Sequence, residues 1–436
     1  MTWQLTLIVF FGLLMFALLS GMALPAAFMA ISGTAAFIFW GGFSGLEQMS
    51  LTLLNTVKTW SLLPIPLFIL MGEILFQTGI MKKALDVVDM WMGKLPGRLA
   101  IVGVLSSVLM GTFTGSSMAA TSMLSTSLVP EMKKRGYATD YSLGSICGAG
   151  GLAMMIPPSS LAVTVATIAG ASVSKTLIGA IVPGLLMGLG YITYIVIRAK
   201  IRPQDAPAYE AEKKPLKERL IFTAVNILPI FLIIFSVSGV ILFGLCTPSE
   251  AAACGVVASI IVTLCMRTLT LGRLKQALLN TTRTSAMLLS IMMGSGMFSS
   301  ILSFSGATKA LTTAVAGLNV SPKIIVFCFM LVVFVLGCFM ETNSIMLITL
   351  PIFIPVITAL GFDKVWFVLI MMVSCEMAES TPPFGVLLFL LKGLFPKEKM
   401  SMIIKAAVPY LCADFVAMMI MFFFPAVALW LPSVVK

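Results

Sequence analysis

The chain has 436 residues, of which 59% are hydrophobic and 10% are charged, and its formal net charge is +11. Soluble domains carry about 25% charged residues, so this composition excludes an ordinary soluble protein and indicates a polytopic membrane protein. The basic residues fall in short connecting segments, which is the positive-inside bias of membrane proteins rather than a nucleic-acid-binding patch.

Apolar runs predict spanning helices from the N-terminus onward. The stretch MTWQLTLIVFFGLLMFALLSG has no basic n-region and no small-residue cleavage site, so we interpret it as a first span rather than a removed signal. The expected spans, in chain order, are 2–20, 22–41, 60–80, 140–169, 176–198, 220–245, 250–268, 282–303, 362–391 and 403–432. The segments too polar or too short to span, which we expect to lie in the membrane interface, are 43–59, 81–95, 270–280 and 306–320.

Two further apolar segments, 98–130 and 323–355, contain polar breaks near their middles. LMGTFTGSSMAA interrupts the first and LGCFMETNS interrupts the second. We expect each segment to be a re-entrant hairpin that enters and leaves on one side of the membrane.

Landmark residues recur at a nearly constant offset. Pro157–Pro158 in GGLAMMIPPSSLAV and Pro382–Pro383 in SCEMAESTPPFGVLLF lie 225 residues apart (382 − 157). Offsets of 225 to 227 residues also relate Pro130 to Pro355, Gly136 to Gly361, Pro183 to Pro409, and Gly79 to Gly306. This series predicts an internal repeat, with one half over residues 1–197 and the other over residues 220–436.

A hydrophilic linker, residues 198–219, joins the two halves. It holds seven basic residues, so we place it in the cytoplasm. Counting spans outward from the linker places residues 131–136 in the cytoplasm and both termini outside. The expected fold is an all-α polytopic membrane protein with two inverted repeats, each with a re-entrant hairpin and a broken helix, which is an architecture of secondary transporters.

The proline pairs are interpreted as the unwound centres of the two broken helices. Proline removes a backbone donor and clashes with the preceding turn. Irregular backbone is tolerated at membrane depth only where it lines a cavity or is buried in protein. A simple kink is the alternative for either pair alone. Two matched pairs, with hydroxyls at Ser159–Ser160 and Ser380–Thr381, favour broken helices.

Hairpin breaks and unwound helices supply the polar groups of the predicted site. Hydroxyls, carbonyls and at most one carboxylate suit a weakly held Na⁺ better than a transition metal, and half-helix N-termini suit an anionic substrate. The residues expected to bind substrate are Thr114, Gly115, Ser116, Ser159, Ser160, Thr342, Asn343 and Thr381. The residues expected to bind Na⁺ are Gly115, Ser116, Ser117, Ile156, Pro157, Glu341, Thr342, Ser344, Ser380, Thr381 and Pro382. The alternative for a single serine or threonine is a bond to the preceding turn or to a neighbouring helix.

Burying a carboxylate inside an apolar run costs free energy. Such residues here suggest proton coupling as an alternative to Na⁺ coupling. Glu73, Glu341, Glu376 and Glu379 are the candidates for carrying a proton. Four scattered glutamates without a histidine partner make a poor relay, so proton coupling ranks below Na⁺ coupling. Glu250 in TPSEAAACG is expected to sit at a helix start, where a carboxylate complements the helix dipole.

Several kinds of chemistry are excluded by residues that the sequence lacks. It has no histidine, which removes HExxH zinc chemistry, a Ser-His-Asp triad and a histidine relay. GASVSKT, residues 170–176, lacks the second glycine of a phosphate loop, so we expect no ATP hydrolysis by this chain. The eight cysteines form no C-x-x-C pair and mostly lie in apolar runs, so we expect neither disulfides nor a metal cluster.

The chain resembles the large, DctM-like membrane subunit of TRAP transporters, the tripartite ATP-independent periplasmic family. The matching stretches lie between about residues 64 and 410 and read PLFILMGEILFQTGI, TGSSMA, KKRGYATDYSLGSICGAGGLAMMIPPSS, VPG, TPSEAAA, LITLPIFIPVITALGFDKVWF and STPPFG. The chain departs from the family at Ala378, where glycine is usual, at Glu379, where an apolar residue is usual, and at Glu341, where a shorter acid or a neutral residue is expected.

The resemblance implies Na⁺-driven uptake of a carboxylate by an elevator-like core in a bacterial inner membrane, so the outside position that the span count gives both termini is the periplasm. It implies two protein partners, a periplasmic substrate-binding protein and a small four-helix membrane subunit, and no cofactor beyond Na⁺ as the coupling ion. Dicarboxylates, keto acids, sialic acids and sugar acids all suit an anion site between half-helices.

Other functional classes fit the sequence less well. An ion channel needs a continuous pore with rings of like residues, which paired dead-end hairpins oppose. An ABC-type permease needs a partner with ATPase loops, and a membrane enzyme needs a nucleophile and a base, of which no pair is visible. We therefore expect a transporter subunit and no enzyme.

Overall fold

The computed structural model describes residues 3–92, 95–114, 116–207, 215–337, 340–382 and 385–434, and within these ranges the regular structure is entirely helical, as predicted. The helices of the first half are α1 (Trp3–Leu19), α2 (Leu24–Phe39), α3 (Phe43–Val57), η1 (Trp60–Leu62), α4 (Pro64–Gln77), α5 (Ile80–Trp91), α6 (Arg98–Thr114), α7 (Ser117–Lys134), α8 (Thr139–Leu152), α9 (Ser160–Ala169), α10 (Val173–Gly179), α11 (Ile181–Ile201) and η2 (Pro203–Asp205). Those of the second half are α12 (Leu216–Ile234), η3 (Phe235–Gly239), α13 (Val240–Leu242), α14 (Pro248–Cys265), α15 (Leu271–Phe304), α16 (Ala307–Ala316), α17 (Pro322–Gly337), α18 (Thr342–Ala359), α19 (Lys364–Glu379), α20 (Val386–Leu394), α21 (Met400–Phe423) and α22 (Pro425–Val434).

Seven helical segments within the described ranges are long and apolar enough to cross a membrane. They are Trp60–Gln77, Val173–Ile201, Leu216–Leu242, Pro248–Cys265, Leu271–Phe304, Thr342–Ala359 and Met400–Phe423. Large apolar side chains stay on their outer faces, and Phe231 of α12 and Val257 of α14 are more than half exposed. Such faces suit lipid rather than water, so the chain is a multi-pass membrane protein.

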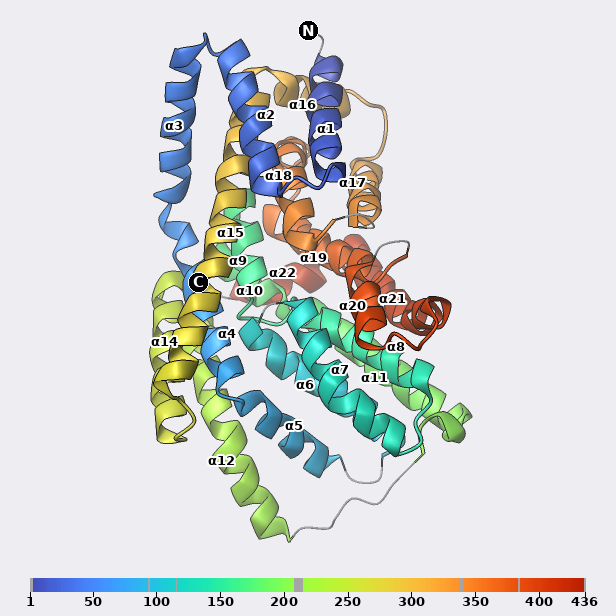
Figure 1. Cartoon of the computed structure of the whole chain (residues 1–436). Coiled ribbons are helices and arrows are strands. Elements are labelled where there is room, and N and C mark those ends of the chain that lie inside the picture. Colours follow the sequence, from blue (N-terminus) through green and yellow to red (C-terminus); the bar gives the residue numbers. More distant parts are fainter. Residues whose placement is uncertain are drawn as a thin grey trace.

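The order of helices in the first half recurs in the second. Helices α5 and α16 both begin after a glycine in the left-handed conformation, Gly79 (φ 73°) and Gly306 (φ 74°). A pair of helices follows in each half, α6–α7 and α17–α18, and each pair ends at a further left-handed glycine, Gly136 (φ 80°) or Gly361 (φ 78°). In Figure 1, α5 and α16 lie at opposite ends of the molecule. The sequence offset therefore marks a repeated set of elements.

Helices α8 and α19 form the centre of the molecule. All residues of α8 from Tyr141 to Leu152 are buried, and so are all residues of α19 from Val365 to Glu379. A helix that is buried on every side belongs to the core. Helix α8 packs against α6, α7, α11 and α21, whereas α19 packs against α17, α18, α21 and α9. The first part of each broken helix, α8 or α19, is therefore buried on all sides by other helices.

Two predicted boundaries differ from the structure. Residues 270–280 are not a separate interfacial helix but the first turns of α15, a helix of 34 residues. Because no proline or glycine falls between Arg273 and Met293, nothing in the backbone ends the helix where the polarity changes. The predicted span 403–432 is two helices, α21 and α22, that part before Pro425. Residues 43–59 form α3, which packs along α2 and α15 (Figure 1).

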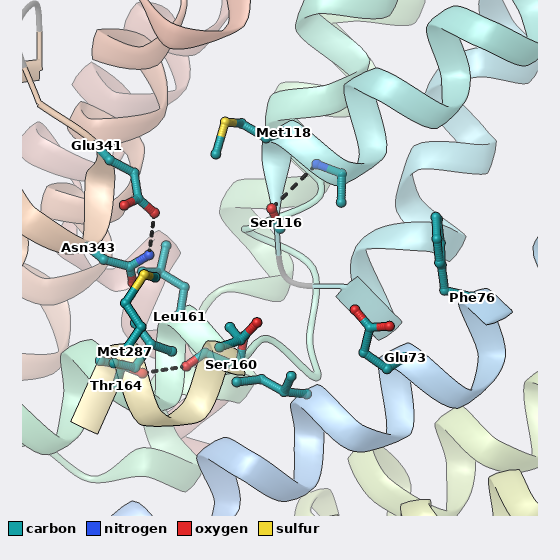
Figure 2. Close-up of a pocket in the computed structure, with 15 residues that line it drawn as sticks. Glu73, Phe76, Ser116, Met118, Ser160, Leu161, Thr164, Met287, Glu341 and Asn343 are labelled. Atoms are coloured by element: carbon teal, nitrogen blue, oxygen red, sulfur yellow. Dashed lines mark hydrogen bonds between the residues drawn. The ribbon is translucent and has the colours of Figure 1, made fainter. Parts of the chain in front are cut away.

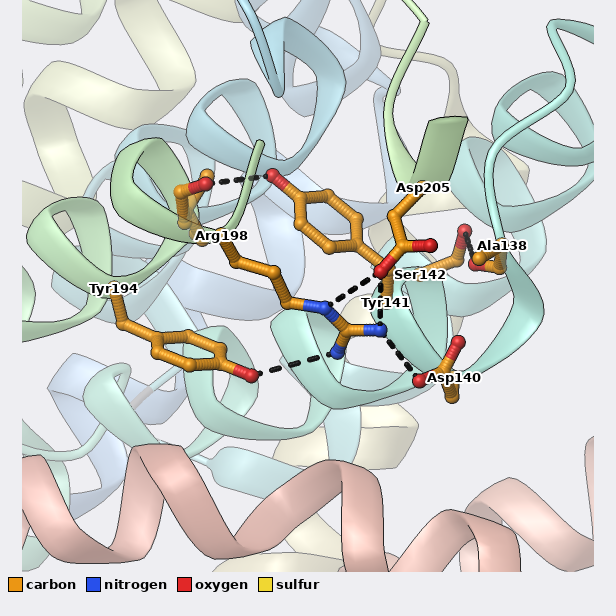
Figure 3. A network of polar contacts seen from close by, with 8 residues as sticks. Ala138, Asp140, Tyr141, Ser142, Tyr194, Arg198 and Asp205 are labelled. Carbon is orange, nitrogen blue, oxygen red and sulfur yellow. Dashed lines mark hydrogen bonds and ion pairs between the residues drawn. The ribbon is translucent and has the colours of Figure 1, made fainter. Parts of the chain in front are cut away.

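The start of the linker is anchored by Arg198 near the end of α11 (Figure 3). Its guanidinium donates to Asp205 at 2.8 and 3.0 Å and to Asp140 of α8 at 2.5 Å. It also lies over the Tyr141 ring, 5.3 Å from the ring centroid, and contacts the Tyr194 hydroxyl at 3.4 Å. The described residues at each end of the linker are helical, because α11 continues to Ile201 and α12 begins at Leu216, while residues 208–214 lie outside the described ranges.

Candidate functional site

The first hairpin turns between α6 and α7, at the polar break in the sequence. Helix α6 ends at Thr114 and α7 begins at Ser117. The Ser116 hydroxyl caps α7 by accepting a hydrogen bond from the Ala119 N–H at 3.4 Å, a role for which serine is favoured. Gly115, predicted for both substrate and Na⁺, lies outside the described residues, and so does the side chain of Thr114.

The second hairpin turns between α17, which ends at Gly337, and α18, which begins at Thr342. Glu341 occupies the N-cap position of α18 without capping it, and its carboxylate accepts a hydrogen bond from Asn343 Nδ2 at 2.7 Å. Thr342 is buried, and its hydroxyl donates to Glu379 of α19. The tip of this hairpin is therefore tied to the second broken helix.

The first broken helix is interrupted over residues 153–159, between α8 and α9, which includes the Pro157–Pro158 pair. All of these residues are buried, and the peptide bond between the two prolines is cis. Ser159 caps α9 by accepting from the Ala162 N–H at 3.3 Å. Within the described part of the chain, the carbonyls of Ile156 and Pro157 accept no hydrogen bond. Buried carbonyls without a donor are suitable ligands for a cation.

The second broken helix is interrupted between Glu379, where α19 ends, and Val386, where α20 begins. The hydroxyls of Ser380 and Thr381 donate to the Met377 carbonyl at 3.2 and 2.6 Å. Both hydroxyl protons are thus bonded to the preceding turn, and only the oxygen lone pairs remain for a cation. Pro383 lies outside the described residues.

A cavity of about 290 Å³ lies where the two hairpin tips approach the first broken helix (Figure 2). Of the predicted substrate residues, Ser116, Ser160 and Asn343 line it. In Figure 2, Ser116 and Ser160 lie between Asn343 on one side and Glu73 on the other. The three predicted substrate residues that are described but do not line this cavity are Ser159, Thr342 and Thr381, and all three are buried.

Other cavity residues come from α4 and α15, which the sequence identified only as plain spans. Glu73 of α4 accepts from Gln77 Nε2 at 3.3 Å and from Asn280 Nδ2 of α15 at 3.0 Å. Apart from Glu73 and Glu341, the lining residues that sequence reasoning missed are Ile69, Gly72, Phe76, Met118, Ala119, Leu161, Thr164, Thr284, Met287 and Leu288. No local signal in α15 distinguishes Thr284 or Met287, because only the packing of that helix decides which face meets the cavity.

Three carboxylates are buried beside this region. Glu376 and Glu379 occupy the last turn of α19, and Asp414 lies in α21. Ser117 Oγ of the first hairpin lies 3.5 Å from Glu376 Oε2, and the Tyr191 hydroxyl donates to Asp414. Sequence reasoning missed Asp414, although an acid inside the apolar run LCADFVAMM is a signal that could have identified it.

The comparisons with known proteins point in one direction. The sequence model of the family described as "Tripartite ATP-independent periplasmic transporter, DctM component" matches residues 7–427. The C4-dicarboxylate TRAP transporter large permease protein DctM of Pseudomonas aeruginosa is 30% identical over 93% of this chain and 93% of its own length. The 2,3-diketo-L-gulonate TRAP transporter large permease protein YiaN of Escherichia coli is 26% identical over 97% of both chains.

Two further similarities extend this comparison. The isethionate TRAP transporter permease protein DctMQ of Oleidesulfovibrio alaskensis is 27% identical over 95% of this chain and 65% of its own length. Among solved structures, the YdaH transporter of Alcanivorax borkumensis has a TM-score of 0.61 and 14% identity, covering 87% of this chain and 88% of that one. At this identity the likeness shows a shared fold alone.

Proposed function

The chain belongs to the DctM family of tripartite ATP-independent periplasmic transporters, as its motifs indicated, and from this premise we propose that it drives import of a small organic anion with Na⁺. As a large permease subunit it is a transport protein of the membrane, and the matched relatives are transporters rather than enzymes. What we propose for this chain is its coupling ion, its substrate class and its partners.

The observation that carries the proposal is the cavity between the two hairpin tips and the first broken helix. Ser116 belongs to the first hairpin and Asn343 to the second, while Ser160 begins α9. The cavity is thus lined by elements of both repeats. Each of these elements has an interrupted helix or a helix end at the cavity. Secondary transporters place their substrate and ion sites at such junctions between repeats.

Na⁺ binding is supported by the backbone at the breaks. In the first site we place Ser116, Ser117, Ile156 and Pro157, with Gly115 from the sequence. The buried carbonyls of Ile156 and Pro157 accept no hydrogen bond from the residues that the structure describes, which suits a hard cation. In the second site we place the oxygen-bearing groups at the matched positions, which are Glu341, Thr342, Ser344, Ser380, Thr381 and Pro382.

An anionic substrate is supported by two helix N-termini at the cavity. Ser116 caps α7 and Ser160 is the first residue of α9, and both side chains line the cavity. Backbone N–H groups at such ends attract carboxylates. C4-dicarboxylates, keto acids, sialic acids and sugar acids share this carboxylate, and we place Thr114, Ser159, Thr342 and Thr381 close behind the residues that touch it.

The partners we propose are a small four-helix membrane subunit and a periplasmic substrate-binding protein. The family is described as tripartite, and the relative named DctMQ is longer than the region that this chain matches. We place the complex in a bacterial cytoplasmic membrane with both termini of this chain in the periplasm. Movement of the core that contains α8 and α19 against the remaining helices, as in an elevator, is the proposed mechanism.

Reconstitution tests the proposal. Proteoliposomes that contain this chain and its small membrane subunit should accumulate a radiolabelled carboxylate when an inward Na⁺ gradient and the substrate-loaded binding protein are supplied without ATP. Omission of the binding protein or of the small subunit should abolish accumulation. Full-rate uptake of free substrate by this chain alone would contradict the proposed assembly.

Proton coupling is the second candidate, because Glu376, Glu379 and Asp414 are buried carboxylates. The same vesicles distinguish the two candidates. Uptake driven by an inward proton gradient in Na⁺-free buffer supports proton coupling, whereas uptake that requires Na⁺ at a fixed proton gradient supports Na⁺ coupling.

A further inference from the structure

The last turn of α19 meets the tips of both hairpins through side chains three residues apart. Ser117 Oγ of the first hairpin lies 3.5 Å from Glu376 Oε2. The Thr342 hydroxyl of the second hairpin donates to Glu379 Oε1. The last turn of α19 is therefore the place at which one tip from each repeat converges, the first on Glu376 and the second on Glu379.

The second oxygen of this carboxylate is buried. Glu379 is 4% exposed, and among the described residues its Oε2 atom has no hydrogen-bond partner. None of the ion pairs within the described ranges joins Glu379 to a lysine or arginine. A buried carboxylate without a compensating charge is expensive, because its hydration is lost and nothing replaces it. Its position thus calls for a positive charge that the described side chains do not supply.

We propose that Glu379 is a ligand of the second coupling cation, which its carboxylate holds together with the Thr342 hydroxyl oxygen. The inference rests on the proposed Na⁺ coupling and adds a charged ligand to a set that otherwise consists of neutral oxygens and Glu341. Carboxylate, hydroxyl and carbonyl oxygens are hard ligands, which suit Na⁺ rather than a transition metal. The cation and Glu379 then form a neutral pair, which removes the penalty of burying either charge alone.

A cation bound at Glu379 also affects the position of the hairpin tip. Thr342 belongs to the second hairpin, so the bound ion draws that tip toward the end of α19, where Ser117 of the first hairpin contacts Glu376. Loss of the ion leaves the Glu379 carboxylate exposed to repulsion from Glu341, which lies next to Thr342 at the same tip. Occupancy of this site therefore changes the surroundings of both hairpin tips.

The test is a Na⁺ titration of the melting temperature of the purified full-length chain, with ionic strength held constant by choline chloride. In Glu379→Gln the amide oxygen still accepts from Thr342, while the charge is removed. We expect its Na⁺ midpoint to rise at least about tenfold above that of the wild type, which corresponds to about 1.4 kcal/mol. The matched control is Ser374→Ala on the same helix, which removes a buried hydroxyl that donates to the Ile370 carbonyl and should keep the wild-type midpoint.

A second pair of variants keeps the test decisive if Glu379→Gln does not fold. Thr342→Ala removes a ligand hydroxyl, whereas Thr349→Ala removes an equally buried hydroxyl of the same helix that donates to the Ile345 carbonyl. Thr342→Ala should raise the Na⁺ midpoint several-fold and Thr349→Ala should not. Wild-type midpoints in both Glu379→Gln and Thr342→Ala would overturn the assignment of Glu379. A wild-type chain that shows no Na⁺ response at all contradicts the proposed Na⁺ coupling instead, so the two failures are distinguishable.

Discussion

Ser117 Oγ lies 3.5 Å from Glu376 Oε2, so a hairpin of the first repeat touches the central helix of the second. Gly151 of α8 packs against the same carboxylate so closely that a Cβ at this position would overlap it. The first hairpin, α8 and α19 therefore meet at one buried acid. Movement of any of these three elements changes the surroundings of the other two.

Removal of the Ser117 hydroxyl should weaken ion binding more than folding. Ser117→Ala removes one buried hydrogen bond, whose net contribution is about 0.5–1.5 kcal/mol. We expect this loss to weaken the ion-bound state, so the Na⁺ concentration for half-maximal uptake should rise about threefold to tenfold. The control is Ser125→Ala on the same helix, which removes a buried hydroxyl without a partner. Uptake at graded Na⁺ concentrations measures the effect, and equal curves for the two variants would refute the role of Ser117.

The cavity should be blocked by a larger side chain on α15. Met287 lines it (Figure 2), so Met287→Trp should fill the space that the substrate needs and reduce uptake by at least about tenfold. Leu279→Trp places the same ring on an exposed position of α15 outside the cavity lining and serves as the control. Unimpaired uptake by Met287→Trp places the substrate elsewhere.

Arg198 should stabilise the end of the first repeat. Its side chain is 15% exposed and is shared between Asp140 and Asp205, and hydrogen bonds to charged groups contribute about 1.5–3 kcal/mol. Arg198→Ala should therefore lower the melting temperature, and Arg198→Lys should recover only part of the loss, because an ammonium group cannot reproduce the planar fork of donors. Complete recovery by lysine would show that charge alone is required.

The topology follows from the basic linker and the repeat. Cysteine at Gln204, in η2, should react only with reagent added from the cytoplasm, and cysteine at Ser433, in α22, only with reagent added from the periplasm. Both positions are exposed. The background must lack the native cysteines, because several of them, including Cys254 and Cys412, are exposed. Labelling of both sites from the same side is incompatible with inverted repeats.

The parts of this architecture that could be predicted are those with a local chemical cause. Polar breaks such as Thr114–Ser117 and the Pro157–Pro158 pair interrupt apolar helices through their own side chains and missing donors, so their positions are visible in the sequence. The same reasoning failed where nothing local changes. Helix α15 continues through residues 270–280 because its backbone has no breaker there.

The site was predictable only in part because it is made by contacts between distant segments. Ser116 and Ser160 face one cavity, as the two breaks suggested. The contact of Thr342 with Glu379 depends on how α18 packs against α19, which no local pattern encodes. The bond of the Thr381 hydroxyl to the Met377 carbonyl is local, but the same hydroxyl could equally bond to a neighbouring helix, so the sequence supports it only as an alternative.

Na⁺ binding at the interrupted helix is tested most directly by restoring the helix. Replacing Pro157 and Pro158 together with alanine returns two backbone donors and allows the helix to close. Carbonyls that are bonded within a helix no longer coordinate an ion. The control is Pro130→Ala, which removes a proline from inside α7, away from the break.

The decisive quantity is the rise of the melting temperature with Na⁺. By mass action, an ion that binds only the folded state stabilises it, by about 2.7 kcal/mol at a concentration 100 times the Kd, and so raises the melting temperature. We predict that this rise is reduced in the Pro157→Ala/Pro158→Ala variant and kept in Pro130→Ala, with Na⁺-dependent uptake lost only in the former. A folded double variant that retains the full stabilisation by Na⁺ would contradict the assignment of the ion to the unwound backbone.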